Sequence, residues 1–514
     1  MSPAPISPVE KVANVIQPTA HASLQDKVEA MRALSVYLGD HVSQDQANQV
    51  LSVVSLPGLY ANLDIDDDEL TKAVCDVINK VLQPFPYEAI IGQDNKTFLI
   101  QGLAHFSPSI RYLCLQQVEK SLASDNSVSS MIHSDIFPLV LTTLAFQDTR
   151  TATKAVDIIA RVALTEPGRV AFFSVQTVAM LRRFLHVSGV VSFRVYELIV
   201  RVAASSDIAF QECELSGLLS HVVSEVKSED LLLKMNAVDM LSEIAATRSG
   251  LTFLQKADLL NDLALVLDEE NETDVAVVLT KCAVLKFFGK LGEQPDVSFE
   301  PIASQYHLLN RLQRCLDSQH KEVAIAAIAS IGLIGSHVNG LRLIYTNPLM
   351  NTVLEGCHSS TGDVKTVYLQ TLSKMLAVTD DSSNNSPSVA QMTLDMFKRM
   401  SGSNTPSLSL LISTAKQPVE ETKIAAFAVL QSVASHTWGR QEMAQSREFL
   451  GYILDRATEH SRQGQTWKYG IVKTLAEAPD SATTFGEHYS MFVQYVRQGP
   501  SFQTNEPMAA LESA

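Results

Sequence analysis

Residues 155–172, AVDIIARVALTEPGRVAF, contain the spacing on which the fold of this 514-residue chain depends. A small residue, Ala155, is followed by apolar side chains at Ile159 and Val162 and by a second small residue at Ala163. Offsets of four, seven and eight place these side chains on one face of an α-helix. We call the first residue of this spacing the anchor. The stretch therefore predicts an amphipathic helix with one apolar face.

The same spacing recurs along nearly the whole chain. Six copies match it closely and five match it more weakly, with anchors at Ala30, Val74, Cys114, Ala155, Val195, Ala237, Val284, Ala327, Tyr368, Ala426 and Lys468. Successive anchors are 40 to 47 residues apart, except for one interval of 58 before Ala426. A period of about 40 to 47 residues is that of armadillo and HEAT repeats. The sequence thus predicts an all-α fold, a right-handed α-solenoid of about eleven armadillo/HEAT-like repeats.

Small residues at two further positions accompany the repeat. The residue eight positions after the anchor is small in the close copies, and we expect it to let neighbouring helices cross without a clash. Four copies also have a glycine thirteen positions after the anchor, at Gly168, Gly250, Gly340 and Gly439. A glycine there suits a chain that turns sharply after a helix. The repeat therefore includes its turn.

The repeat also determines the expected domain organisation, because a solenoid grows in one dimension and its length does not require several domains. We expect residues 21–498 to form one continuous solenoid with an insertion near 380–407. The insertion has loop-forming Ser, Asn, Gly and Pro residues around one short apolar helix. It could contact a partner or be a tolerated surface excursion, and we favour the second. Residues 1–20 and 499–514 are predicted to be flexible tails.

The composition argues against several classes of function. A net charge of −16 without any block of basic residues disfavours nucleic-acid binding. The six cysteines are widely dispersed, which indicates reduced thiols rather than a disulfide framework. The sequence shows no apolar signal region and no run long enough to span a bilayer. We therefore expect a cytoplasmic protein, with the nucleus as a second compartment, and no membrane partner.

The sequence lacks the usual catalytic and metal-binding motifs, including phosphate loops, nucleophile elbows and zinc-protease helices. The acidic run at 64–69 lacks the Gly and Glu that a calcium loop needs, so we interpret it as the acidic first turn of a helix. The acidic run at 268–274 is interpreted as a solvated loop between repeats. We expect a non-enzymatic protein with no cofactor, no metal and no catalytic residue.

A candidate partner-binding surface lies two and six positions after each anchor, where side chains are predicted to line the concave face of the solenoid. Most of these side chains are charged, and charge on an exposed groove suits protein recognition. The residues selected as candidate contacts are Asp157, Arg161, Glu197, Arg201, Asp239, Glu243, Lys286, Lys290 and Lys374.

The charges on this surface have two interpretations. Asp157 with Arg161 is spaced i, i+4, as is Glu197 with Arg201, so these pairs could simply neutralise each other on a solvated face. The pair Asp239 and Glu243, like the pair Lys286 and Lys290, combines equal charges at i, i+4, which opposes helix formation slightly. Either the neighbouring repeat or a partner protein could neutralise these like-charged pairs, and the sequence leaves both alternatives open.

The C-terminal ninety residues carry a more specific signal. Its elements are KIAAFAVLQSVA at 423–434, Trp438, FLGYILDR at 449–456, Glu459-His460, KYGIVKTLA at 468–476, Phe485-Gly486 and Gln498-Gly499-Pro500. Their order and spacing closely resemble the 26S proteasome non-ATPase regulatory subunit 5 family. The aromatic residues among them are expected to pack the last repeats, so they identify no contact residue.

The resemblance implies a dedicated assembly chaperone for the base of the proteasome regulatory particle. Such a protein holds AAA ATPase subunits before they join the ring and leaves before the particle is complete. Its concave surface would bind the C-terminal domain of one ATPase subunit, and a large non-ATPase base subunit is a further candidate partner. The protein is expected to be a monomer outside that complex.

A transport or trafficking adaptor that binds extended peptides is the alternative. Armadillo adaptors of that kind present rows of Trp and Asn in the groove. This chain has only two tryptophans, Trp438 and Trp467, and neither lies two positions after an anchor. The sequence therefore favours the assembly chaperone.

Overall fold

The computed structural model describes residues 7–16, 22–379, 388–402 and 405–501. Within these ranges the regular elements are α-helices and short 3₁₀-helices, and no strand occurs. The contacts divide the chain into two compact units, unit 1 at Met1–Glu225 and unit 2 at Val226–Ala514, which are described separately. The predicted all-α solenoid is confirmed, whereas the single continuous domain stays a prediction.

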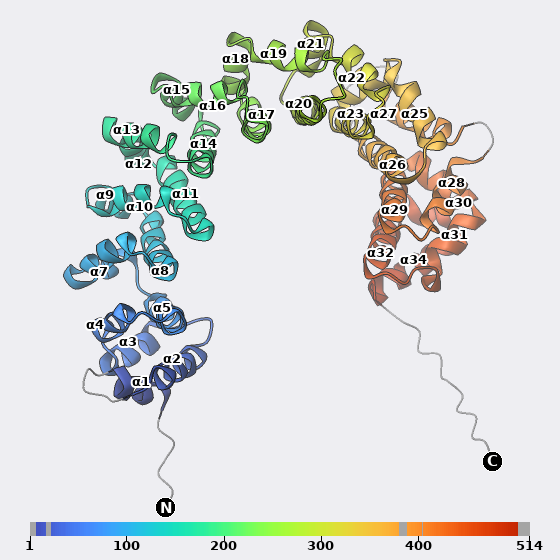
Figure 1. Ribbon diagram of the computed structural model, residues 1–514. Helices are drawn as coiled ribbons and strands as arrows, with labels where there is room; N and C mark the ends of the chain where they lie inside the picture. Colours follow the sequence, from blue (N-terminus) through green and yellow to red (C-terminus); the bar gives the residue numbers. More distant parts are fainter. Residues whose placement is uncertain (1–6, 17–21, 380–387, 403–404, 502–514) are drawn as a thin grey trace, which may run out of the picture. The chain divides into compact units, whose positions relative to one another are not determined.

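Unit 1 is built on five anchor helices, α2 (Leu24–Leu38), α5 (Asp68–Leu82), α8 (Pro108–Glu119), α11 (Thr149–Leu164) and α14 (Gly189–Ala203). Each packs on the next, and all five lie on the same side of the unit (Figure 1). The other helices are α1 (Pro8–Ile16), α3 (Gln44–Val53), α4 (Leu56–Tyr60), η1 (Ala61–Asp64), α6 (Tyr87–Ile90), α7 (Gln93–Ala104), η2 (Lys120–Ala123), α9 (Asp125–Ile132), α10 (Ile136–Thr142), η3 (Thr143–Ala145), α12 (Glu166–Phe172), α13 (Val175–Phe184), α15 (Asp207–Leu215) and α16 (Leu218–Glu225).

Unit 2 by itself has six anchor helices, α17 (Leu231–Ala245), α20 (Val275–Glu293), α23 (Lys321–Ile334), α26 (Gly362–Leu376), α29 (Glu420–Ala434) and α32 (Arg462–Glu477). Each of these packs on the next one in the chain. The remaining helices are α18 (Arg248–Lys256), α19 (Leu259–Val266), α21 (Phe299–Gln305), α22 (Leu308–Leu316), α24 (Val338–Tyr345), α25 (Leu349–Ser359), α27 (Val389–Arg399), α28 (Ser407–Ala415), α30 (Thr437–Gln445), α31 (Arg447–Leu454), η4 (Arg456–Thr458), α33 (Ser481–Phe485) and α34 (His488–Gln498).

The anchor spacing locates the core of both units. All eleven predicted anchors lie on these anchor helices, and all eleven are buried. The small residue eight positions later has the predicted role: a methyl group added at Gly292 would lie 2.6 Å from Ile334 Cγ1, and one at Gly335 would lie 2.8 Å from Met375 Cγ. Successive helices in unit 2 therefore cross too closely for a larger side chain at these positions.

The glycine thirteen positions after the anchor serves a different purpose from the predicted one. None of the four glycines has a positive φ. Each lies in the first turn of the helix that follows the anchor helix, and an added methyl group would lie 1.7 to 2.0 Å from a carbonyl oxygen near the end of that anchor helix. The glycine is thus required for close approach of two backbones, not for a left-handed turn.

The predicted flexible N-terminal tail is wrong for residues 8–16, which form α1. The sequence PVEKVANVI is amphipathic, and Val12 is fully buried where α1 packs on α2 and α3. Burial of an apolar face against the first repeat is sufficient reason for this segment to fold. Residues 1–6 and 17–21, like most of the predicted C-terminal tail, lie outside the described residues.

The insertion predicted near 380–407 contains the expected short helix, α27, but this helix is not a surface excursion. Val389, Met392, Met396 and Phe397 are buried, and α27 packs on α26, α28 and α30. By its place in the order of elements, α27 is the first helix after an anchor helix, as α24 is in the preceding repeat. The helix therefore belongs to the packed repeat, and residues 380–387 and 403–404 lie outside the described residues.

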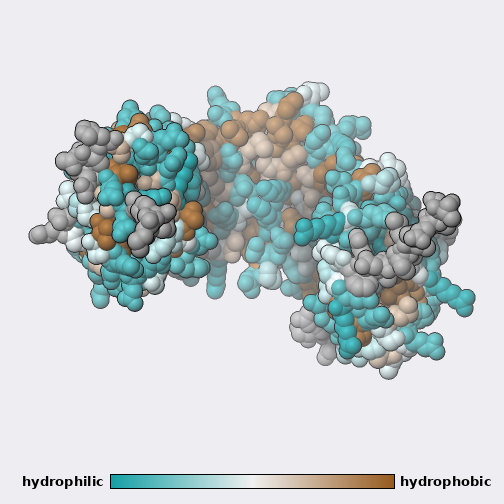
Figure 2. Space-filling view, turned by 90° about the horizontal axis from the view of Figure 1, so that it is seen from below, coloured by the Kyte–Doolittle hydropathy of each residue, from teal (hydrophilic) through white to brown (hydrophobic). Residues whose placement is uncertain are grey.

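On the face seen in Figure 2, hydrophilic side chains cover much of the surface and hydrophobic side chains reach it in several patches. No single helix in the described ranges is both long and apolar enough to cross a membrane, and one pair, Asp125–Ile132 with Ile136–Ala145, meets the criteria of length and composition only across a bend of 79°.

Candidate functional site

The selected residues of unit 1 form a network of ion pairs along successive anchor helices. Arg161 on α11 contacts Glu119 on α8 at 2.8 Å, and Arg201 on α14 contacts Asp157 on α11 at 3.4 Å. The predicted i, i+4 pairs are longer, at 3.6 Å for Arg161 with Asp157 and 3.7 Å for Arg201 with Glu197. The shorter contacts thus connect neighbouring repeats, a feature that spacing within one helix could not predict.

In unit 2 three of the four like-charged residues, Asp239, Lys286 and Lys290, neutralise one another across the helix interface. Asp239 on α17 accepts hydrogen bonds from Lys290 at 2.7 Å and from Lys286 at 3.0 Å, both on α20. Partial burial raises the pKa of Asp239, but the hydrogen bonds and the positive charges of Lys290 and Lys286 together outweigh burial and hold it below its ordinary value. Of the two alternatives left open by the sequence, neutralisation by the neighbouring repeat is therefore found for Asp239.

Two selected residues of unit 2 are not part of such a pair. Glu243 on α17 and Lys374 on α26 are exposed, and neither forms an ion pair with any described residue. Between their helices, α23 presents Ala329 and Leu333 at the corresponding positions, so the charged surface is interrupted there. Glu243 and Lys374 are thus the selected charges that form no ion pair with another described residue.

The acidic run at 268–274 is more than a solvated loop. Asp268 accepts hydrogen bonds from Arg311 at 2.6 to 3.1 Å and pairs with Arg314, both on α22. Glu272 pairs at 2.8 Å with Lys281, whose side chain is buried. Hydrogen bonds from Arg311 are the largest cause of the lowered pKa of Asp268. Asp268 and Glu272 therefore connect the loop to the next repeat through ion pairs. The interpretation of this run as simply a solvated loop is corrected.

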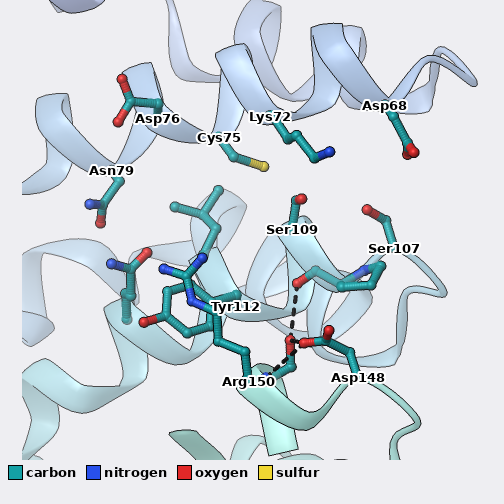
Figure 3. A pocket seen from close by; sticks show the side chains of 14 residues that line it. Asp68, Lys72, Cys75, Asp76, Asn79, Ser107, Ser109, Tyr112, Asp148 and Arg150 are labelled. Atoms are coloured by element: carbon teal, nitrogen blue, oxygen red, sulfur yellow. Dashed lines mark hydrogen bonds between the residues drawn. The ribbon is translucent and has the colours of Figure 1, made fainter.

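Sequence reasoning missed a groove on unit 1, which we call the unit-1 groove. It lies between α5, α8 and the start of α11 and has a volume of about 510 Å³ (Figure 3). Its lining residues are Asp68, Lys72, Cys75, Asp76, Asn79, Ser107, Pro108, Ser109, Tyr112, Leu113, Gln116, Asp148, Arg150 and Thr151. These residues come from three consecutive repeats. The only feature of the sequence that could have indicated the groove is the repeat period, because it brings the three helices together.

Several groups of the unit-1 groove are occupied by internal contacts. Asp148 caps α11 by accepting hydrogen bonds from the backbone N–H and hydroxyl of Thr151 at 2.8 and 2.6 Å. These hydrogen bonds are the main reason that the pKa of Asp148 lies below its ordinary value, and the nearby charge of Arg150 lowers it further. The Arg150 guanidinium lies over the Tyr112 ring at 4.2 Å. These contacts hold the side chains of Asp148 and Arg150 in place within the groove.

The C-terminal repeat has a buried cation at its anchor. Lys468 is 1% exposed, and its ammonium group donates hydrogen bonds to the carbonyl oxygens of Tyr452 and Asp455 and to the Thr458 hydroxyl at 2.6 to 2.8 Å. Burial lowers the pKa of Lys468 to about 8. Phe449 and Tyr452 are buried and Trp438 is half-buried, so the quoted C-terminal motifs form a structural core, as expected.

No group of three His, Cys, Asp or Glu side chains in the described part of the chain could hold a metal ion. The fold and the charged anchor-helix faces together define the class of protein: an all-α solenoid with exposed charged side chains along its anchor helices.

Comparison with known proteins gives the family. A family model described as Proteasome non-ATPase 26S subunit matches residues 10–514, and the chain belongs to this family. Relatives named 26S proteasome non-ATPase regulatory subunit 5 include the Bos taurus protein, 24% identical over 501 residues, and the Homo sapiens protein, 23% identical over 502 residues; both alignments cover 96% of this chain and 97% of the relative. The Drosophila melanogaster relative is 20% identical over 410 residues, covering 79% of this chain and 78% of its own.

Solved structures with some similarity include engineered and designed proteins. One engineered protein is 16% identical and covers 83% of this chain and 99% of its own, with a TM-score of 0.37. A computationally designed armadillo repeat protein for modular peptide recognition, also 16% identical, covers 45% of this chain and 99% of its own, with a TM-score of 0.32.

Proposed function

We propose that the protein is a non-enzymatic assembly chaperone of the base of the 26S proteasome regulatory particle. It holds the C-terminal domain of an AAA ATPase subunit against its anchor-helix surface and leaves before the particle is complete. Family membership supports a role with the proteasome, since the relatives carry the name of a non-ATPase regulatory subunit. The observation that carries the proposal is the row of exposed charged side chains on packed anchor helices, a surface suited to a folded protein domain.

The proposed partners follow from the same role. An ATPase subunit is the principal partner, a large non-ATPase base subunit is a second one, and the protein works in the cytoplasm and nucleus as a monomer between binding events. A repeat protein of this type offers an extended surface rather than a closed pocket, which suits a partner that must later be released.

The decisive experiment separates partner contact from internal pairing at Asp239, Lys286 and Lys290. In the double variant Lys286→Glu, Lys290→Glu, three carboxylates face one another, so both stability and binding fall. Adding Asp239→Lys restores an internal ion pair of opposite polarity. Binding of each variant to the ATPase C-terminal domain is measured by calorimetry at two salt concentrations, with the melting temperature as control.

The triple variant gives the informative result. If these charges contact the partner, its melting temperature recovers while binding stays weakened by about tenfold or more, as expected for charge reversal at a desolvated contact. If binding recovers together with stability, the three residues act only within the protein, and Glu243 and Lys374 are the next residues to reverse. Absence of binding by the wild-type protein to every base ATPase subunit contradicts the chaperone proposal itself.

A further inference from the structure

A groove in unit 2 is lined mainly by apolar side chains. It lies beside the first half of α17, the second half of α19 and the first half of α20, and α20 packs on both other helices (Figure 1). We call it the unit-2 groove, because all of its lining residues belong to unit 2. Its volume is about 290 Å³, and its apolar lining residues are Val226, Val238, Leu263, Leu265 and Val266.

Exposed hydrophobic side chains gather around this groove. Of the five large hydrophobic residues of unit 2 that are exposed in the described chain, three are Leu232, Leu265 and Val275. Leu265 lines the groove and is 52% exposed, and the other two precede the lining residues Lys234 and Thr280 by two and five positions. The rise of an α-helix places them within about 8 Å of the lining along the helix axes. Such a concentration of exposed apolar side chains marks an interaction site.

Most polar groups of the lining already have partners. The Thr280 hydroxyl donates to the Ala276 carbonyl oxygen at 2.7 Å, and Lys227 pairs with Asp262 at 3.0 Å. Lys234 forms no ion pair with any described residue, but its long side chain can keep the ammonium group in water. An apolar group that enters the groove therefore leaves no buried polar group without a partner.

The size of the groove favours a side chain of another polypeptide over a free small molecule. Sites for small molecules and cofactors usually have volumes of about 300 to 1,000 Å³. A volume of about 290 Å³ lies at the lower limit of that range. The unit-2 groove thus suits a large apolar side chain such as Leu, Met or Phe.

The segments that form the groove surround it with negative charge. Residues 226–234 and 262–274, which supply most of the lining, contain eight carboxylates and two lysines. Three further cations of unit 2 pair with these carboxylates, namely Lys281, Arg311 and Arg314. Eight carboxylates thus face five cations, and Glu269 and Glu270 are exposed without an ion pair to any described residue. The surroundings of the groove are therefore acidic and complementary to a basic partner.

From this arrangement we propose that the unit-2 groove binds a segment of a partner protein in which a large apolar residue is flanked by Lys or Arg. The apolar side chain enters the groove beside Leu263 and Leu265, and the basic side chains lie close to Glu269 and Glu270. The inference does not rest on the chaperone proposal, because the groove contains none of the selected anchor-helix charges and the test uses peptides.

The test begins with a phage-displayed random peptide library selected on the full-length protein. We expect the retained peptides to combine a large apolar residue with Lys or Arg, and we expect this enrichment to be lost on the Leu265→Asp variant. Enrichment of Asp and Glu, or no enrichment of any residue type, would overturn the proposal. Melting temperature and helical circular dichroism show that each variant is folded, and the milder Leu265→Ala is measured in parallel.

Binding of one selected peptide, measured by fluorescence anisotropy, separates apolar contact from attraction between charges. Leu265→Asp is expected to weaken binding by about tenfold although it adds a negative charge, and Glu269→Lys with Glu270→Lys is expected to weaken it by about tenfold through repulsion. Leu215→Asp makes the same change at an exposed leucine of unit 1 and should leave the affinity unchanged. Tighter binding by Leu265→Asp, or equal weakening by Leu215→Asp, would show that the peptide is not held in the groove.

A second copy of the chain is the alternative occupant. Sedimentation velocity of the wild-type protein over a range of concentrations tests for it, and we expect a single monomeric species. A dimer that disappears in the Leu265→Asp variant would mean that a second copy fills the groove, and this result would overturn the proposal.

Discussion

At the scale of single residues, Gly340 determines how closely two helices of a repeat approach. Its N–H donates to His337 Nδ1 at 3.3 Å, and His337 Nε2 donates to the Gly292 carbonyl oxygen of the preceding repeat at 2.7 Å. A methyl group on Gly340 would lie 1.7 Å from the Ile334 carbonyl oxygen. One missing side chain thus permits a short turn and a hydrogen bond between repeats.

Replacing Gly340 by alanine is therefore expected to destabilise unit 2 by about 3 kcal/mol or more, since backbone has to move to relieve the overlap. Thermal unfolding followed by circular dichroism measures the effect. Gly189 is the matched control, because it too lies in the first turn of a helix and no atom lies within 4 Å of an added methyl group. Gly189→Ala should be neutral or slightly stabilising, and an equal loss in both variants would refute the close-approach explanation.

Lys468 gives a prediction about pH. Its pKa is about 8 in the folded protein because of burial, below the value near 10.5 in the unfolded chain. Between these pH values the unfolded chain binds more protons, so the free energy of unfolding rises with pH, by about 3 kcal/mol at most. We expect the wild-type protein to gain stability relative to Lys468→Met as the pH rises from 8 to 10. Parallel pH profiles of the two proteins in chemical denaturation would contradict this.

At the scale of elements, α27 is a core helix although the sequences on both sides of it have the composition of loops. Phe397 is 3% exposed, and its ring centroid lies 5.3 Å from that of Trp438 on α30. Phe397→Ala is therefore expected to cost about 3–5 kcal/mol, the usual range for a buried aromatic residue. Melting temperatures measure the cost, with exposed Lys398→Ala of the same helix as control. A loss below about 1 kcal/mol would restore the interpretation of this segment as a surface excursion.

At the scale of the whole molecule, stability is the sum of contacts between neighbouring helices. Each unit contains its own set of packed anchor helices and its own buried residues. We expect residues 226–514 to fold without unit 1, with a helical circular dichroism spectrum and a cooperative melting transition. A spectrum of unfolded chain, or melting without any transition, would show that this unit depends on unit 1.

The candidate site was only partly predictable from the sequence. The positions two and six after the anchor correctly predicted exposed charged side chains such as Glu243 and Lys374. The sequence did not show which group neutralises Asp239. Lys286 and Lys290 lie on a helix more than forty residues away, and only packing brings them within 3.0 Å of Asp239. The unit-1 groove was missed for the same reason, since its lining comes from three repeats.

The sequence by itself determined the class of fold, the repeat period and every anchor of the core, because spacing along one helix determines which side chains share a face. Tertiary structure decided which charges neutralise one another, that α1 and α27 are packed elements, and that Gly340 and its equivalents permit close backbone approach. These properties depend on distances between helices that are far apart in the chain. Such distances follow from how successive repeats pack, and no spacing within a single repeat specifies them.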